Sequence, residues 1–179
     1  MEEETRKQSR SQAFVDAVLE RCERDGGFAA NLRRADNPAT EHYAYGLLAA
    51  FGIDLERDAE RRPFALIGAA LSRIKAARDG SLGLGEALRR CVESADQGEA
   101  RLRRMLACRR QEEACGLARP LLSLIAARNV PLCHARLLEE LLAFHSDNDE
   151  ARRRICLRWA REFYGAASGD AGEERPCDS

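Results

Sequence analysis

Apolar residues recur at intervals of three and four along most of this 179-residue chain, and this periodicity constrains the fold more than any other feature. No stretch alternates clearly, or is rich enough in β-branched residues, to indicate a strand. Ala, Leu, Glu and Arg dominate the sequence, and all four are strong helix formers. The clearest stripe has offsets of 0, 3, 4, 7, 8 and 11 within residues 132–145: His134, Leu137, Leu138, Leu141, Leu142 and His145. The sequence therefore predicts an all-α protein.

Breaks in this pattern divide the chain into nine predicted helices. Thr40 is the expected N-cap of the third helix, and Gly52 its terminator. Pro63 falls in the first turn of the fourth, where a missing N–H costs little. Pro120 should kink or split the seventh. The predicted helices are 12–24, 28–35, 40–51, 60–78, 86–94, 98–110, 112–129, 132–145 and a final helix that Asp147 to Asp149 cap and that ends at Tyr164.

The segment DGSLGLG, residues 79–85, is the most loop-like stretch in the interior of the chain. We interpret it as a flexible connection between two small packed helical bundles. The first predicted bundle spans residues 12–78, and the second spans residues 86–165. The polar residues 1–11 and the acidic tail 166–179 are predicted to be disordered.

The basic charge is concentrated in the second half of the chain, although the net charge of the whole is only −1. Residues 1–100 carry 15 Lys+Arg and 18 Asp+Glu, whereas residues 101–161 carry 13 Arg and 7 acids. Residues 162–179 carry 1 Arg and 5 acids. A local excess of positive charge is what binding to a polyanion requires.

No motif for catalysis, for a metal or for a cofactor is found in the sequence. The glycines of GSLGLGEA lack the Lys-Ser/Thr of a phosphate-binding loop, and no strand precedes them. The 3 histidines and 7 cysteines do not have the spacing of a zinc site. We expect His134 and His145 to pack in or near the core, and we expect the cysteines to be free thiols in a reducing compartment.

Two further observations favour a cytoplasmic protein. There is no apolar run of about 18 residues, so no transmembrane helix is expected. The polar N-terminal stretch MEEETRKQSRSQ also lacks the apolar segment of a secretory signal.

The stretch WAREFYG, which ends the last predicted helix, holds the only tryptophan. Ile155, Trp159 and Phe163 are spaced i, i+4 and i+8, so they should face the core, with the neighbouring arginines on other faces. Stacking of Trp159 or Tyr164 on nucleic-acid bases is the alternative interpretation.

Arginine carries almost all of the positive charge, with 27 Arg against only Lys7 and Lys75. A solvated helix surface, or a GC-rich genome, would explain this. However, like charges three or four residues apart destabilise a helix, so several such clusters suggest an anionic partner such as phosphate. The clusters are Arg33-Arg34, Arg61-Arg62, Arg101 with Arg103 and Arg104, Arg109-Arg110, and Arg154 with Arg158 and Arg161.

Several stretches, in this order, resemble the CasB family, the small subunit of the type I-E CRISPR surveillance complex Cascade. They are ANLRRADNP (30–38), RRPFALIGAALSRI (61–74), SLGLGEAL (81–88) with EARLRRMLACRR (99–110), and LLEELLAFHSDNDEARRRICLRWAREFY (137–164). The resemblance covers about residues 12–165. The N-terminal decapeptide, the segment 53–60 and the tail have no counterpart in the family pattern.

The resemblance implies a non-catalytic helical protein that needs no cofactor. It implies two copies arranged head to tail within the complex, beside the other Cascade subunits, and no contact with a membrane. Its basic surface would lie along the guide RNA and the target DNA and stabilise the R-loop. The positions that match basic residues of the family are Arg34, Arg61, Arg101, Arg110 and Arg119, and the neighbouring candidates are Arg33, Arg62, Arg104 and Arg154.

Two other classes of function remain open at this point. The chain could be a helical adaptor for protein partners whose arginine clusters are solvated and have no nucleic-acid role. It could also be an enzyme with a reactive thiol at Cys108 or Cys115, although no histidine lies nearby in the sequence to act as a base.

Overall fold

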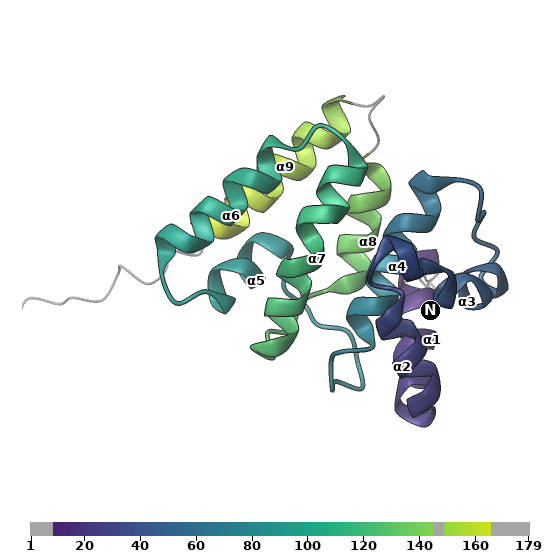
Figure 1. Ribbon diagram of the computed structural model, residues 1–179. Helices are drawn as coiled ribbons and strands as arrows, with labels where there is room; N and C mark the ends of the chain where they lie inside the picture. Colours follow the sequence, from purple (N-terminus) through teal and green to yellow (C-terminus); the bar gives the residue numbers. More distant parts are fainter. Residues whose placement is uncertain (1–8, 145–148, 166–179) are drawn as a thin grey trace, which may run out of the picture.

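The computed structural model describes residues 9–144 and 149–165 (Figure 1). The expectations for residues 1–8, His145, Asp147 and the tail 166–179 lie outside these residues. Within the described residues the elements are nine α-helices and one short 3₁₀ helix, which confirms the all-α prediction. In chain order they are α1 (Arg10–Arg24), α2 (Gly26–Arg34), η1 (Pro38–Ala44), α3 (Tyr45–Ala50), α4 (Asp58–Leu71), α5 (Leu84–Cys91), α6 (Ala95–Ala107), α7 (Gln111–Ala127), α8 (His134–Ala143) and α9 (Asp149–Gly165).

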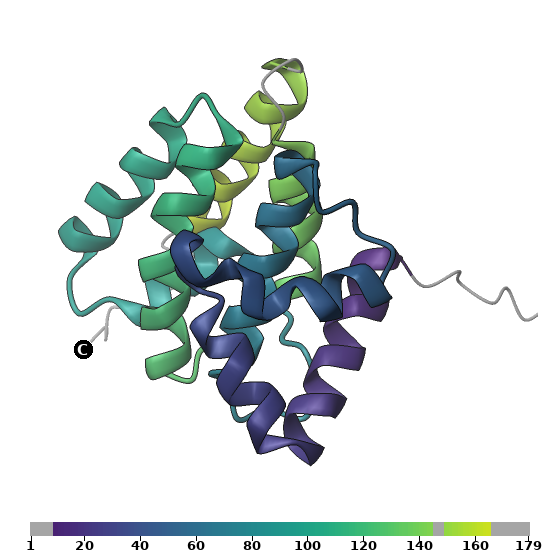
Figure 2. The same ribbon diagram turned by 45° about the vertical axis from the view of Figure 1, so that its right-hand side comes forward.

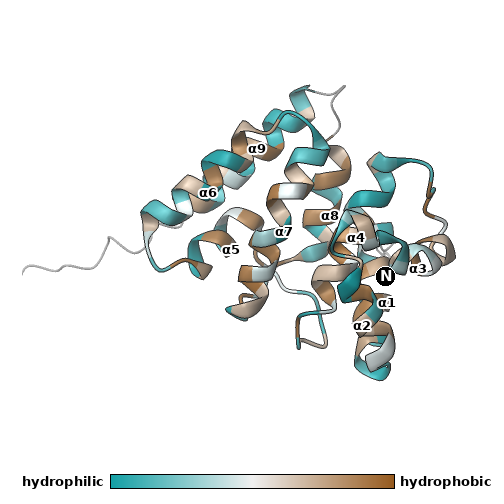
Figure 3. Cartoon of the chain, viewed as in Figure 1, coloured by the Kyte–Doolittle hydropathy of each residue, from teal (hydrophilic) through white to brown (hydrophobic). Residues whose placement is uncertain are grey.

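The hydrophobic core runs from the first helix to the last. In the first half, α4 packs against α1, α2 and α3, and in the second half α5, α6 and α9 pack together. Helices α7 and α8 join these two groups, because both contact α4 and α8 also packs against α1 (Figure 2). The core is therefore continuous across the predicted boundary at residues 79–85. Among the longer helices, α4, α7 and α8 are the most hydrophobic, and α6 and α9 are among the most hydrophilic (Figure 3).

The predicted helix 40–51 is in fact two elements, η1 and α3. The side chain of Asn37, rather than Thr40, caps the start, because its Oδ1 accepts a hydrogen bond from the backbone N–H of Ala39 at 3.0 Å. Thr40 instead donates to the backbone carbonyl of Arg34, where α2 ends. Gly52 terminates α3 with a φ of +65°, which confirms its predicted role.

Helix α4 ends at Leu71, earlier than the predicted Arg78. The Ser72 hydroxyl donates to the carbonyl of Ala69 at 2.7 Å, and Arg73 reaches out to the carboxylate of Asp36. The Ser72 bond to the backbone competes with continuation of the helix.

Both helix-interior prolines are accommodated without breaking their helices. Helix α4 begins at Asp58, so Pro63 lies beyond the first turn and leaves the carbonyl of Ala59 without its helical N–H donor. The side-chain amide of Gln111 donates to that carbonyl at 2.9 Å. Pro120 was expected to kink or split α7, and α7 is not split; Pro120 and Gly116, four residues before it, are both exposed. Exposure of this turn leaves room for water to bind the carbonyl that Pro120 leaves without a helical donor.

The segment 79–85 is held by specific contacts on both sides. Leu82 forms an isolated bridge with Leu132, and the N–H of Cys133 donates to the carbonyl of Leu82 at 2.8 Å. The carboxylate of Asp79 accepts from the backbone N–H groups of His134 and Ala135, both at 2.9 Å, and so caps α8 from a distance in sequence. The predicted flexible connection is thus a packed crossing between the two halves.

The glycines in this segment allow α9 to approach closely. A methyl group at Gly85 would lie 2.0 Å from the carbonyl oxygen of Trp159, and one at Gly83 would lie 2.2 Å from the carboxylate of Glu162. The N–H of Gly85 also donates to Glu162 at 3.2 Å.

Trp159 is fully buried, which confirms that it anchors the core. Its ring stacks on Phe144 with the centroids 5.8 Å apart, and its indole N–H donates to Glu140 at 2.7 Å. Glu140 is only 4% exposed and also accepts from Arg136 at 3.3 Å and from Arg158 at 3.1 Å. Three donors therefore compensate this buried carboxylate.

We predict that Gly85→Ala lowers the free energy of unfolding by about 2 kcal/mol or more, because a backbone carbonyl of α9 occupies the space of the new methyl group. Gly116→Ala is the matched control. Nothing lies within 4 Å of its added methyl group, and alanine favours a helix more than glycine does. The free energy of unfolding should therefore rise by about 0.5–1 kcal/mol in this variant. Urea unfolding of the two variants measures both values, and equal stability would contradict the prediction.

We predict that Asp79 makes the fold acid-sensitive. Burial of its carboxylate raises its pKa, but hydrogen bonds from His134 and Ala135 outweigh burial and leave the pKa lowered. The stabilisation is therefore complete above the unfolded-state pKa of about 3.9 and is lost as the pH falls through the lower folded pKa. Asp79→Asn should be less stable than the wild type at pH 7, and urea unfolding should show this difference shrinking in acid. A difference that does not change with pH would contradict this role.

Candidate nucleic-acid interface

Eight of the nine predicted arginines are spread over five helices and the ninth, Arg110, directly precedes one of them, and the structure gives the nine three different environments. Some are held inside the fold, some form exposed ion pairs, and some have no carboxylate partner among the described residues. Arg33 and Arg34 end α2, Arg61 and Arg62 lie on α4, Arg101 and Arg104 on α6, Arg110 precedes α7, Arg119 lies on α7 and Arg154 on α9.

Arg61 is held within the fold. Its side chain is 16% exposed, and it contacts the carboxylate of Glu41 at 2.5 Å and that of Asp58 at 2.6 Å. It also donates to the backbone carbonyl of Leu55. Burial lowers the pKa of Arg61, but the bonds to Glu41 and Asp58 outweigh burial and raise it. Arg61 therefore links η1, the loop before α4, and α4 itself.

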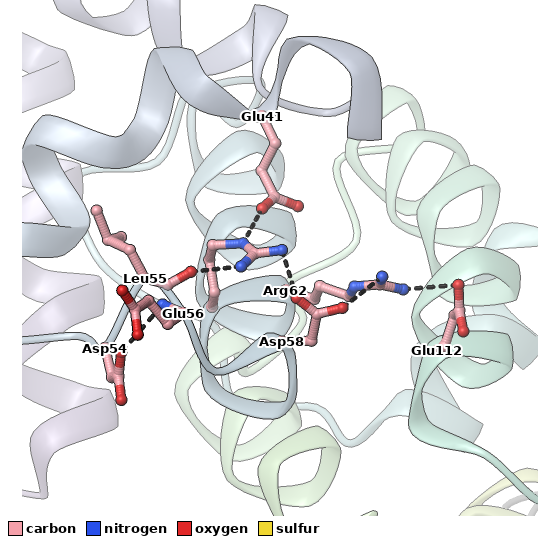
Figure 4. Close-up of polar contacts among 8 residues, drawn as sticks. Glu41, Asp54, Leu55, Glu56, Asp58, Arg62 and Glu112 are labelled. Carbon is pink, nitrogen blue, oxygen red and sulfur yellow. Dashed lines mark hydrogen bonds and ion pairs between the residues drawn. The ribbon is translucent and has the colours of Figure 1, made fainter.

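Arg62 and Arg119 bind carboxylates from distant parts of the sequence. Arg62 lies between Asp58 on its own helix, at 2.6 Å, and Glu112 on α7, at 2.7 Å (Figure 4). Arg119 approaches Asp36 at 3.4 Å, but its Nε atom is buried without a hydrogen-bond partner. Both arginines line a hollow of about 340 Å³ between α4, α7 and the chain after α2.

Arg110 and Arg154 form exposed ion pairs with nearby residues. Arg110 contacts Glu113 at 2.9 Å, and Arg154 contacts Glu150 at 3.1 Å. Such pairs contribute little to stability, and phosphate can compete for the guanidinium groups.

Arg33, Arg34, Arg101 and Arg104 have no carboxylate partner in the described part of the chain. Arg33 donates only to the backbone carbonyl of Ala29, at 3.3 Å. The guanidinium of Arg34 lies over the ring of Tyr43, 5.5 Å from its centroid. Among the nine candidates, these four guanidiniums are therefore the ones that could bind an anion without giving up an ion pair.

The unpaired and the held arginines lie on both sides of α7. Arg101 and Arg104 face α7 across a hollow of about 290 Å³. Gly116 lines the hollow that holds Arg62 and Arg119, and it also lines a second hollow beside Arg104. The hollow with Arg62 and Arg119 and the hollow beside Arg104 therefore share the exposed turn of α7 at Gly116, and Asp36, which follows α2, lines the first of them.

Sequence reasoning missed the carboxylates that determine these environments. Asp36 binds both Arg73 and Arg119, and Glu112 binds Arg62, although each lies 37 or more residues from its partner in the chain. Helical spacing indicates only partners three or four residues away, such as Glu150 for Arg154. No sequence pattern indicated the contact between Arg34 and the ring of Tyr43 either.

The six cysteines of the described residues are free thiols but are poorly suited to nucleophilic chemistry. Burial raises the pKa of Cys115 to about 12, and burial also raises the pKa of Cys108. His134 is buried and its Nδ1 lies 2.9 Å from Asp79, in the core position that its stripe predicted. In residues 9–144 and 149–165, no group of three His, Cys, Asp or Glu side chains could hold a metal ion. No helix of this region is long and apolar enough to cross a membrane.

We predict that Arg61→Ala destabilises the protein, because it leaves the buried carboxylate of Glu41 without its cation. The free energy of unfolding should fall by about 2 kcal/mol or more. Arg104→Ala removes a guanidinium with no partner and should change this free energy by less than about 0.5 kcal/mol. Thermal and urea unfolding of the two variants tests this, and an Arg61→Ala protein of wild-type stability would contradict it.

Comparison with known proteins identifies the fold and the family. Similar solved structures include CasB from Thermobifida fusca, with 18% identity, a TM-score of 0.65 and coverage of 88% of this chain and 99% of that chain. CasB from M. ruber shares 23% identity, with a TM-score of 0.69 over 92% of this chain and 97% of that one. A chain of a CRISPR RNA-guided surveillance complex shares 17% identity, with a TM-score of 0.70 over 90% and 97%. A search of curated protein sequences gives no significant match.

The family model for CRISPR-associated protein Cse2 matches residues 29–164, which extend from α2 to the end of α9 and include all nine candidate arginines. This is most of the chain, and it agrees with the sequence resemblance to CasB proteins. The chain therefore belongs to the CRISPR-associated protein Cse2 family.

Proposed function

We propose that this protein is a non-catalytic subunit of a type I-E CRISPR surveillance complex, Cascade. In this proposal its arginine-rich surface lies along the guide RNA and the target DNA and stabilises the R-loop, which serves antiviral defence. Two copies would sit head to tail beside the other subunits. The family membership and the likeness to a chain of a solved surveillance complex support this assignment.

The observation that carries the nucleic-acid role is that four of the nine candidate arginines have no carboxylate partner in the described residues: Arg33, Arg34, Arg101 and Arg104. Arginines that only stabilise a helical protein would be expected to pair with its carboxylates, as Arg61 and Arg62 do. A guanidinium without such a partner can bind a phosphate by charge-assisted hydrogen bonds and loses no internal contact in doing so. We rank these four arginines above Arg61, Arg62, Arg110, Arg119 and Arg154 as nucleic-acid contacts.

Contacts to phosphates would be sufficient for this role. Exchange of a DNA duplex for an RNA–DNA heteroduplex is nearly balanced in energy, so a few contacts to the backbone can favour the open state. Such contacts need no sequence preference, because base pairing with the guide supplies it. The carboxylates that neutralise most other arginines would limit binding to unrelated polyanions.

The test uses the full chain assembled with the other Cascade subunits and a guide RNA. The double variant Arg34→Ala/Arg101→Ala should weaken binding of the target DNA, and should reduce the salt dependence of that binding because two phosphate contacts are lost. Its thermal midpoint and its incorporation into the complex should match those of the wild type.

Arg24→Ala/Arg103→Ala is the matched control. It removes the same charge, but from arginines that form exposed ion pairs with Glu20 and Glu99. Target affinity that falls equally in both double variants would indicate a general charge effect. Unchanged affinity in Arg34→Ala/Arg101→Ala would exclude these contacts and favour the adaptor function.

A further inference from the structure

The groove between α6 and α7 combines an apolar floor with a charged rim. Its floor consists of Met105 from α6 together with Leu117, Pro120, Leu121 and Leu124 from α7, and Arg101 and Arg104 form the rim. We propose that this groove binds one unpaired nucleotide of a single strand, with the base on the floor and the adjacent phosphates between the two arginines. This inference rests on the proposed nucleic-acid role and adds the kind of contact made here.

The floor remains accessible although it belongs to the core. Met105 and Leu121 are buried, whereas Leu117 and Leu124 are half-buried and Pro120 is exposed. A hollow of about 290 Å³ lies over these side chains, near the lower limit of about 300 Å³ for pockets that bind small organic molecules. A second hollow of about 450 Å³ continues the groove, because Arg104 and Leu117 line both.

The rim favours an anion as the occupant. Arg101 and Arg104 are spaced i, i+3 and lie on one face of α6, and neither has a carboxylate partner in the described residues. Glu113 lines the second hollow, but its carboxylate is bound by Arg110 at 2.9 Å. Arg103, between the two in sequence, is held by Glu99 on a different face. The groove thus presents two free guanidiniums beside apolar side chains.

A single strand matches this combination better than a duplex does. The bases of a duplex are stacked and paired, so only its phosphates could reach the rim and the apolar floor would stay uncovered. An unpaired nucleotide offers a flat apolar face and flanking phosphates. Single-strand binding sites combine a positively charged groove with aromatic side chains on which bases stack. In this groove the aliphatic side chains of the floor take the place of the aromatic ones. The displaced DNA strand and exposed guide RNA are both sources of such nucleotides.

The experiment compares strands that differ only in their bases. Fluorescently labelled oligothymidylate, oligouridylate and an abasic deoxyribose strand of equal length are titrated with the full chain at low salt, and fluorescence anisotropy reports binding. The wild type should bind the strand with bases about tenfold more tightly than the abasic strand. The thymidylate and uridylate arms show whether the groove distinguishes DNA from RNA.

Two floor variants test the site of this difference. Pro120→Gln and Leu117→Gln should each reduce the preference for bases and leave the affinity for the abasic strand unchanged. Pro120 is exposed, and the substitution restores a helical N–H, so that variant should fold even if Leu117→Gln does not. Leu157→Gln is the matched control, because Leu157 is 60% exposed on α9, outside the groove.

Two rim variants separate the contribution of charge. Arg101→Ala/Arg104→Ala should weaken binding of all three strands, whereas Arg103→Ala should change none of them. If the wild type binds normal and abasic strands equally, the base site is excluded and a role in phosphate binding survives. If it binds no strand even at low salt, both the base site and the proposed nucleic-acid role of the isolated surface are excluded.

Discussion

The side-chain amide of Gln111 holds together the parts of the protein on which the candidate interface depends. Gln111 is the first residue of α7, and its Nε2 donates to the carbonyl of Ala59 on α4 at 2.9 Å and to that of Leu141 on α8 at 2.7 Å. The first carbonyl lacks a helical donor because Pro63 has no N–H. One amide thus satisfies two backbone acceptors and fixes the start of α7 against both halves of the protein. Because α7 forms one wall of the hollows lined by Arg62, Arg101 and Arg104, this contact helps to fix where those hollows lie.

Carboxylates divide the candidate arginines of the described residues into a group with ion pairs and a group without them. Glu41, Asp58 and Glu112 hold Arg61 and Arg62, and these pairs connect η1, α4 and α7. On α6, by contrast, Arg101 and Arg104 face apolar side chains of α7 and have no carboxylate in reach within the described residues. The two groups differ in which side chains lie near the guanidinium in the folded protein. A nearby carboxylate makes the guanidinium part of the fold, and without one it is available to a partner.

The sequence predicted the helices well because their stripes depend only on local spacing. The spacing of Ile155, Trp159 and Phe163 placed all three in the core, where each is at most 5% exposed. The errors occurred where distant residues decide the local structure. Gln111 compensates for Pro63, and Asp79 caps α8, 55 residues away. The glycines of residues 79–85 suggested flexibility, whereas they serve close packing against α9 and the turn before α8. The arginine site could not be predicted in full for the same reason: Glu112 and Arg62 are 50 residues apart in the sequence, and only the fold brings them together.

The packing of α8 against α1 and α4 has a consequence for how the protein is made. Helices α1 to α4 leave the ribosome first, but part of their apolar surface is covered only by α7 and α8. During translation this surface stays open to water, or to other chains, until synthesis has passed residue 143. The N-terminal half therefore completes its core only late in translation, and the nascent chain depends over that interval on rapid synthesis or on chaperones to avoid aggregation.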